Sequence, residues 1–500
     1  MKHLLALFLA LAAAWEASAQ SPPDPKREFR GVWITTIHNV DWPSREDLPM
    51  EEQQQQLLKI LDRCADLGLN AIVLQVRSEC DALYPSDLEP WSPWLTGTMG
   101  KSPGYDPLQF AINAAHQRGL ELHAWFNPFR AVNSAHGRIC KTHITRSHPE
   151  YTSRYGDKVW LDPAIPTVRA RALEVIKDVL KRYDIDAVHL DDYFYPYPIK
   201  VGDTYKDFDD SKTWAVYQKS GGTLLRADWR RGHVNDFVSK VHRLVREEKP
   251  SCKFGISPFG IYRPGQPAQV KASLDSYDQI YTDTRLWLRE GWLDYVAPQL
   301  YWESSSTQYG FAGLYEWWGD ENVHNRHVWP GIALYRIKTE GRTAYDSLKQ
   351  VNIYRTGSHQ PASCGHVLFS MESLMANYSN VTALLKSKVY TESALVPASP
   401  WLGEDAAKLP QVAPVIANRE KNALEINWQA PQRDAAKVRW WLIQTLTDTT
   451  WKTMRLVAGT DSKLRIPGKP QQIAIRAVGR SGVLGAVSMI STAPDTASPP

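Results

Sequence analysis

The sequence predicts a (β/α)₈ barrel with enlarged loops, followed by a small all-β sandwich. Eight short apolar runs rich in β-forming residues alternate with segments of helical spacing, and after the last of them the pattern changes to period-two alternation. Eight strands with seven helical connections over about 350 residues is the count of such a barrel. An open doubly wound sheet more often carries a Gly-rich phosphate loop after its first strand, and this sequence has none.

The order of the predicted elements follows from these runs. Strands are expected at 30–37, 70–77, 120–127, 186–192, 253–260, 294–301, 328–335 and 366–371. Helices are clearest at 51–67, 107–118, 166–182, 234–248 and 283–290. Gly68 and Gly119 follow two of these helices as C-caps, and Asp106 before Pro107 is a typical helix start. The helix ends therefore agree with the periodicity.

The N-terminus has the features of a secretory signal peptide at residues 1–19. A basic start at Lys2 precedes a short apolar stretch, and small residues lead up to Ala19. The stretch is too short to stay as a membrane span, and no cysteine stands at the cleavage site to carry a lipid anchor. The mature protein is therefore expected in the periplasm or secreted.

Composition divides the rest of the chain. The barrel is expected at 27–390, a Pro-containing linker at 391–410, the sandwich at 411–491 and a disordered tail at 492–500. The sandwich strands are predicted at 423–428, 438–445, 454–457, 463–466 and 472–478. The motifs LEINW at 424–428 and IAIRAV at 473–478 resemble a fibronectin type III module, which implies an accessory domain that contacts the cell-wall surface.

Charge and cysteine content exclude several classes of partner. The net charge is +4 and no Lys/Arg stripe is present, so nucleic acid is not expected. The five cysteines are scattered and lack a C-x-x-C pair, which leaves room for one disulfide but predicts no zinc site or disulfide framework. The 20 Trp and 22 Tyr residues suit a protein that binds amphipathic ligands such as sugars.

Polar and aromatic residues stand at the predicted carboxyl ends of the strands, where barrel enzymes place their active sites. The expected substrate-binding residues are Trp33, His38, Gln75, Arg77, Glu79, His123, Trp125, Asn127, Arg130, Tyr193, Gln299, Tyr301, Trp302, Tyr335 and Glu372. Together they predict a polar, aromatic-lined cleft for carbohydrate, with no cofactor.

Two adjacent carboxylates, Asp191 and Asp192, end the fourth strand. Glycosidic cleavage needs one carboxylate as nucleophile or base and one protonated carboxyl as acid. Asp191 or Asp192 is expected to be the first, and Glu303, whose pKa its neighbour Trp302 would raise, the second. Glu79 and Glu372 are the other candidates for the acid. The structural alternative for the aspartate pair is that it caps a helix or forms an ion pair.

Metal chemistry is the weaker interpretation of the histidines. The spacings His189-x-Asp191 and His123-x-Trp125 match no recognised ligand pattern, so no metal is predicted. A histidine on a strand such as His123 is more often a hydrogen-bonded core residue than a ligand.

Six blocks of sequence resemble one known family. They are REFRGVWI at 27–34, DWPS at 41–44, YDPL at 105–108, HAWFNPFR at 123–130, HLDDYFYP at 189–196 and APQLYW at 297–302. In this order they are similar to the hallmark blocks of the glycosyl hydrolase-like family 10 barrel. The resemblance implies a (β/α)₈ glycoside hydrolase, and relatives in the bacterial envelope act on peptidoglycan glycan strands stripped of their peptides.

Two functions remain open at this point. The first is a periplasmic or secreted glycoside hydrolase that cleaves cell-wall glycan, and the second is a non-catalytic protein that binds this glycan. The presence of Asp191, Asp192 and Glu303 together favours the enzyme, because a protein that only binds gains little from three carboxylates that are costly to bury.

Overall fold

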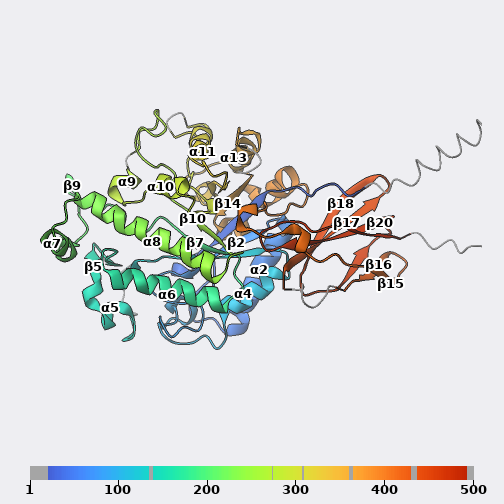
Figure 1. The fold of residues 1–500 in the computed structure, drawn as a ribbon, viewed down its shortest axis with the longest axis horizontal. Helices are drawn as coiled ribbons and strands as arrows, with labels where there is room; N and C mark the ends of the chain where they lie inside the picture. The colour runs from blue at the N-terminus through green and yellow to red at the C-terminus, as the bar shows by residue number, and fades with distance from the viewer. Residues whose placement is uncertain are drawn as a thin grey trace, which may run out of the picture. The chain divides into compact units, whose positions relative to one another are not determined.

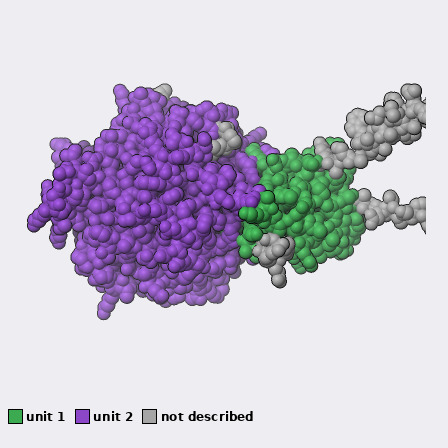
Figure 2. Space-filling model, in the orientation of Figure 1, with its two compact units in different colours: residues 1–26, 407–478, 484–500 green, residues 27–406, 479–483 purple. Residues whose placement is uncertain are grey.

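The computed structural model describes residues 21–133, 139–272, 274–306, 309–359, 364–429 and 436–492. The predicted signal peptide and almost all of the predicted tail lie outside these residues. The chain forms two compact units, one of residues 27–406 with 479–483, and one of residues 1–26, 407–478 and 484–500 (Figure 2). Each unit is built around its own sheets.

The first unit is the predicted (β/α)₈ barrel. Its parallel strands, in order around the sheet, are β1 (Phe29–Ile34), β2 (Ala71–Arg77), β3 (Glu121–Phe126), β7 (Ala187–Leu190), β10 (Lys253–Ile256), β11 (Tyr295–Val296), β12 (His327–Val328) with β13 (Gly331–Ala333), and β14 (Gly365–Phe369). Strands β12 and β13 are two parts of the seventh strand: β12 pairs with β11, β13 pairs with β14, and β14 pairs with β1. The sheet therefore closes on itself.

Helices cover the outside of the barrel (Figure 1). The longer ones are α2 (Met50–Leu67), α4 (Pro107–His116), α6 (Pro166–Arg182), α7 (Ser211–Lys219), α8 (Arg226–Glu248), α11 (Phe311–Asp320) and α13 (Ala344–Thr356). The shorter ones are α3 (Pro93–Thr96), α5 (Ile144–Ser147), α9 (Ser276–Gln279), α10 (Thr284–Arg289), α12 (Arg336–Thr339), α14 (Met371–Ala376) and α15 (Val381–Leu384). The Asp106 side chain caps α4 through the Gln109 amide at 3.0 Å, and Gly68 ends α2 with a φ of 88°.

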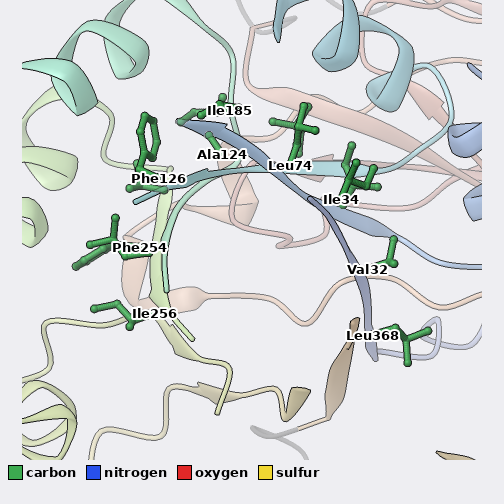
Figure 3. Packing of buried hydrophobic residues seen from close by; sticks show 14 of the residues in the cluster. Val32, Ile34, Leu74, Ala124, Phe126, Ile185, Phe254, Ile256 and Leu368 are labelled. Atoms are coloured by element: carbon green, nitrogen blue, oxygen red, sulfur yellow. The ribbon is translucent and has the colours of Figure 1, made fainter. Parts of the chain in front are cut away.

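Two hydrophobic cores hold the barrel together. The outer core lies between strands and helices. Strand residues such as Val32, Leu74 and Phe254 (Figure 3) form one buried cluster with helix residues such as Leu57 and Leu61 of α2. This arrangement follows from the alternation of side chains along each strand, since every second residue faces the helices. The other residues of each strand face the inside of the barrel. Both faces of the strands are therefore buried, and the strands read as continuous apolar runs.

The inner core fills the barrel and is aromatic. The rings of Phe29 and Trp329 stack at 3.7 Å between centroids, and Tyr295 lies 4.7 Å from Trp329. A Cβ atom at Gly255 would lie 2.2 Å from the Tyr295 ring, so only glycine leaves room for this ring inside the barrel. The barrel interior is therefore a packed core beneath its mouth, and not a pore.

The loops of the barrel unit contain two small sheets. One contains β4 (Arg130–Val132), β5 (Thr152–Tyr155) and β6 (Lys158–Leu161), and the other contains β8 (Lys200–Val201) and β9 (Thr204–Tyr205). They lie in the segments after barrel strands three and four, which confirms that the loops at the strand ends are enlarged.

The second unit is an all-β region with two antiparallel sheets. They consist of β15 (Val415–Arg419), β16 (Ala423–Asn427) and β19 (Lys463–Pro467), and of β18 (Thr450–Ala458), β17 (Val438–Thr447), β20 (Gln472–Gly479) and β21 (Ser488–Ser491). The sequence did not predict β15 and β21, because β15 is largely exposed and lacks apolar alternation. The more specific resemblance to fibronectin type III stays a prediction.

Two further features bear on the predicted setting of the protein. No helix in the described part of the chain is long and apolar enough to cross a membrane. The five cysteines are all free, with Cys64, Cys80 and Cys252 buried. The disulfide for which the sequence left room is therefore not formed in this structure.

Candidate active site

A cavity of about 310 Å³ opens at the carboxyl ends of the barrel strands. Its lining residues are Trp33, Thr35, Ile37, Gln75, Trp125, Arg130, Asp191, Tyr193, Ser257, Gln299, Tyr301, Tyr335 and Phe369. They come from all eight strand ends, and nine of them were expected from the sequence. The cavity has one carboxylate, one guanidinium and several aromatic walls, which suits the binding of a sugar, whereas cleavage would need a second carboxyl group as acid.

Asp191 is the carboxylate in this cavity. Strand β7 turns His189 and then Asp191 toward the barrel axis, so Asp191 reaches the mouth one layer above His189. Its Oδ2 accepts hydrogen bonds from the side-chain amide of Asn127 and, at 3.2 Å, from Trp125 Nε1. Its Oδ1 accepts one from the Tyr193 amide at 3.3 Å. Three N–H donors therefore fix this carboxylate in one orientation.

The neighbouring Asp192 has a different environment. Its Oδ2 accepts a hydrogen bond from the Tyr197 hydroxyl, whereas its Oδ1 is buried without a hydrogen-bond partner among the described residues. Burial, together with the negative charge of Asp191, raises the pKa of Asp192 to about 7. Burial also raises the pKa of Asp191, but Arg130 and its N–H donors oppose this rise. The negative charge of the pair is therefore best placed on Asp191.

A network of polar side chains supports Asp191 from behind. Asn127 Oδ1 accepts hydrogen bonds from Gln75 Nε2 at 2.8 Å and from Arg130 Nη2 at 2.9 Å. The Gln75 Oε1 in turn accepts the Ile37 amide at 3.0 Å. Because the amide oxygen of Asn127 is occupied in this way, its NH₂ group faces Asp191. The loops after the first three strands thus determine the position of the carboxylate.

The structure places the remaining predicted carboxylates away from this cavity. The Glu303 side chain is 51 % exposed and lies 3.7 Å from the Arg342 guanidinium, so the apolar setting expected from Trp302 is wrong. Trp302 itself packs on Phe259 and Tyr309 and does not line the cavity. Glu303 follows the cavity residue Tyr301 after two positions and therefore lies near the rim. Its catalytic role stays a prediction.

Glu372 also lies near the rim, half-buried, beside Lys338 at 3.4 Å and the Tyr378 hydroxyl. Glu79 and His38 line a second cavity of about 610 Å³ next to the mouth. This second cavity is larger, but the aspartate pair does not line it. We therefore take the smaller cavity as the candidate active site.

Two predicted binding residues are not at the mouth. Arg77 is buried in an ion pair with Glu89, to which its Nε donates at 2.7 Å. The register of β2 against β3 shifts between Gln75 and Arg77, and only Gln75 lines the cavity. His123 lies two residues before Trp125 on β3, roughly 7 Å deeper in the barrel. The expectation that Arg77 and His123 bind substrate is corrected accordingly.

Sequence comparison identifies the family of this barrel. The glycosyl hydrolase-like 10 family model matches residues 28–346. The chain belongs to the glycosyl hydrolase-like 10 family. It is 38 % identical over 441 residues to the glycosyl hydrolase YngK of Bacillus subtilis (strain 168), covering 85 % of this chain and 84 % of YngK. It is 35 % identical over 343 residues to the glycosyl hydrolase DigH of Escherichia coli (strain K12), covering 64 % of this chain and 76 % of DigH.

A solved structure supports the fold of this glycosyl hydrolase-like 10 barrel. The catalytic domain of β-amylase from Paenibacillus polymyxa superposes with a TM-score of 0.50 and 12 % identity, covering 74 % of this chain and 99 % of that domain. At this identity the likeness shows a shared barrel fold and carries no statement about substrate.

Inside the barrel of this family member, a continuous series of hydrogen bonds runs below the cavity. Trp33, which lines the cavity, donates its Nε1–H to His189 Nε2 at 3.3 Å. Burial, and then the nearby His123, lowers the pKa of His189 well below its ordinary value. The neutral His189 therefore carries its proton on Nδ1 and donates it to the Tyr295 oxygen at 2.9 Å.

The same series continues to the base of the barrel. The Tyr295 hydroxyl donates to His123 Nδ1 at 2.9 Å, and His123 Nε2 donates to Glu121 at 2.9 Å. Lys253 closes the series with an ion pair to Glu121 at 2.8 Å. His123 is thus a hydrogen-bonded core residue. Among the described residues no three His, Cys, Asp or Glu side chains are placed to hold a metal ion.

Five residues at the site were not among the expected catalytic and binding residues. Thr35, Ile37, Ser257 and Phe369 line the cavity, and Tyr197 binds Asp192. The aromatic run after Asp192 was a signal for Tyr197, since it continues to that residue. Ile37 and Phe369 carry no such signal, because an apolar residue at a strand end is ordinarily part of the core.

Proposed function

We propose that this protein is a periplasmic or secreted glycoside hydrolase that cleaves cell-wall glycan, specifically peptidoglycan strands without peptides. The observation that carries the proposal is the oriented carboxylate of Asp191 in a cavity with aromatic walls at the barrel mouth. Membership of a glycosyl hydrolase-like family agrees with this chemistry. The predicted signal peptide supports a location outside the cytoplasm.

In the proposed reaction Asp191 acts as nucleophile or base. Its three N–H donors and the nearby Arg130 stabilise the negative charge that this role requires. Asp192 holds its proton up to about pH 7, so the pair carries one charge in place of two. Because Asp192 does not line the cavity and its Oδ1 is buried, we assign it no proton transfer to the substrate.

We assign the acid role to Glu303, which approaches from the end of the sixth strand. As general acid, Glu303 would give its proton to the leaving-group oxygen of a glycan bound at the barrel mouth. Glu303→Gln is then expected to abolish cleavage of poor leaving groups and to spare substrates with an activated leaving group, because these need no proton. Normal cleavage of both by Glu303→Gln would transfer the role to Glu79 or Glu372.

The decisive experiment measures reducing ends released from peptide-free peptidoglycan glycan, compared with chitin and plant polysaccharides. Wild type should act on the first, and Asp191→Asn should be inactive while keeping its fold. Binding of the glycan by wild type without any cleavage would instead support a non-catalytic glycan-binding protein.

A further inference from the structure

The second cavity lies directly beside the active-site cavity. Ile37 lines the first cavity and the next residue, His38, lines the second; likewise Arg130 lines the first and Ala131 the second. The two cavities therefore share a wall made by the loops after strands β1 and β3. With about 610 Å³ the second cavity is the larger, and both are within the roughly 300–1,000 Å³ of ligand sites.

One half-buried aromatic side chain, Trp94, dominates the second cavity. Its Nε1 donates a hydrogen bond to Glu79 Oε2 at 3.2 Å, and the ring of His38 stands edge-on to it at 4.6 Å. The Asn133 amide donates to the other Glu79 oxygen, and the Asn133 side chain bonds His38 Nε2 at 2.9 Å. The indole is thus held in a fixed orientation by a carboxylate that accepts its N–H and by an imidazole beside it.

The backbone next to Trp94 is also held in an unusual conformation. His38 and Asn39 have φ values of 56° and 53°, in the left-handed region that costs non-glycine residues of order 1 kcal/mol each. The Asn39 side chain donates to the Trp94 carbonyl at 2.8 Å and stabilises this conformation. Such strain persists where a structure has to place particular side chains, and here it places His38 in the cavity wall.

The buried carboxyl at the base of this cavity is not used in the proposed reaction. Glu79 is 6 % exposed and has hydrogen-bond donors on both oxygens. Burial, and then the charge of Asp81, raises its pKa, while the Asn133 amide and Arg130 oppose the rise. An indole face with carboxyl, imidazole and amide groups around it matches a sugar ring, which presents C–H groups on its faces and hydroxyls at its edge.

We propose that the second cavity binds a further sugar ring of the same glycan strand whose scissile bond lies at Asp191, with Trp94 as the stacking platform. This inference rests on the proposed function and adds to it a preference for long chains. Binding energy from such a remote ring contributes to transition-state stabilisation only when the substrate spans both cavities. A single-sugar substrate cannot use it.

The test compares kcat/KM on long peptide-free glycan strands with kcat/KM on a single-sugar glycoside that has an activated leaving group. Trp94→Ala should lower the ratio of the two values about tenfold, which corresponds to ~1.4 kcal/mol. Trp94→Phe should restore most of the ratio. Trp214→Ala, which removes a half-buried Trp from α7 outside both cavities, should leave the ratio unchanged.

A second variant covers the case in which Trp94→Ala does not fold, as judged by circular dichroism. His38→Asn removes the imidazole and keeps a residue that tolerates the left-handed backbone, and it should lower the same ratio several-fold. A ratio unchanged in the folded Trp94 and His38 variants overturns the inference. The inference is also overturned if Trp94→Ala lowers kcat/KM only on glycan strands that carry peptides, because the cavity then binds a peptide.

The same data separate this inference from the proposed function. Wild type that cleaves neither substrate refutes the proposed function itself. Wild type that cleaves both, with ratios that do not respond to Trp94→Ala, refutes only the second sugar site.

Discussion

Replacing Tyr295 by Phe removes the central hydroxyl of the hydrogen-bond series inside the barrel. This hydroxyl contacts His123 and His189, each at 2.9 Å, and both imidazoles are fully buried. Its loss leaves one donor and one acceptor without a partner, and each unsatisfied buried group costs roughly 1–3 kcal/mol. We therefore expect Tyr295→Phe to lower the free energy of unfolding of the barrel by roughly 2–4 kcal/mol.

Urea unfolding followed by far-ultraviolet circular dichroism measures this change, because the α-helices in the described part of the chain all belong to the barrel unit. Tyr84→Phe is the matched control. Tyr84 is equally buried, but its hydroxyl has no hydrogen-bond partner among the described residues, so its removal breaks no hydrogen bond and should leave the free energy of unfolding unchanged or raise it, by up to about 1–3 kcal/mol. If both variants show the same small change, the hydrogen bonds to Tyr295 contribute nothing to stability and the argument is refuted.

Three further changes have expected outcomes. Asp191→Asn should reduce turnover on glycan by several orders of magnitude with little loss of stability, and near wild-type turnover would remove it from the mechanism. Asp192 has a folded-state pKa of about 7, above its unfolded value, so its contribution to stability is present at low pH and lost as the pH rises through 7. Asp192→Asn should therefore be more stable than wild type at about pH 8 but not at about pH 4. Urea titrations at both pH values measure this difference. A chain that ends at Ala406 should keep its barrel fold and its activity on short glycans while binding insoluble wall material less well, whereas aggregation would show that the two units depend on each other.

The positions of the barrel strands were predictable because they depend on local patterns. Each of the eight predicted runs overlaps a strand of the structure, and the helix predicted at 166–182 has the bounds of α6. The site was predictable in outline for a related reason: parallel strands bring their carboxyl ends to one edge, so polar residues that follow the strands must gather there. This rule alone placed Trp33, Gln75 and Asp191 at the mouth.

Strand-end position did not determine which of these side chains face the cavity. Gln75 and Arg77 lie two residues apart on one strand, and a shift in register separates the cavity residue from the one that pairs with Glu89. Such a shift depends on how neighbouring strands pair, which one strand's sequence does not contain. His123 has the correct parity but lies one layer too deep.

The sequence by itself determined the barrel, the family and the aspartate pair, because periodicity and short motifs are local properties of a chain. Only the tertiary structure decided that Asp191 lines the cavity and Asp192 does not, that Glu303 lies exposed beside Arg342, and that Trp94 joins Glu79 in a second cavity. These contacts join residues on different loops. Burial and hydrogen bonding, which set the charge of each carboxylate, exist only after those loops have packed.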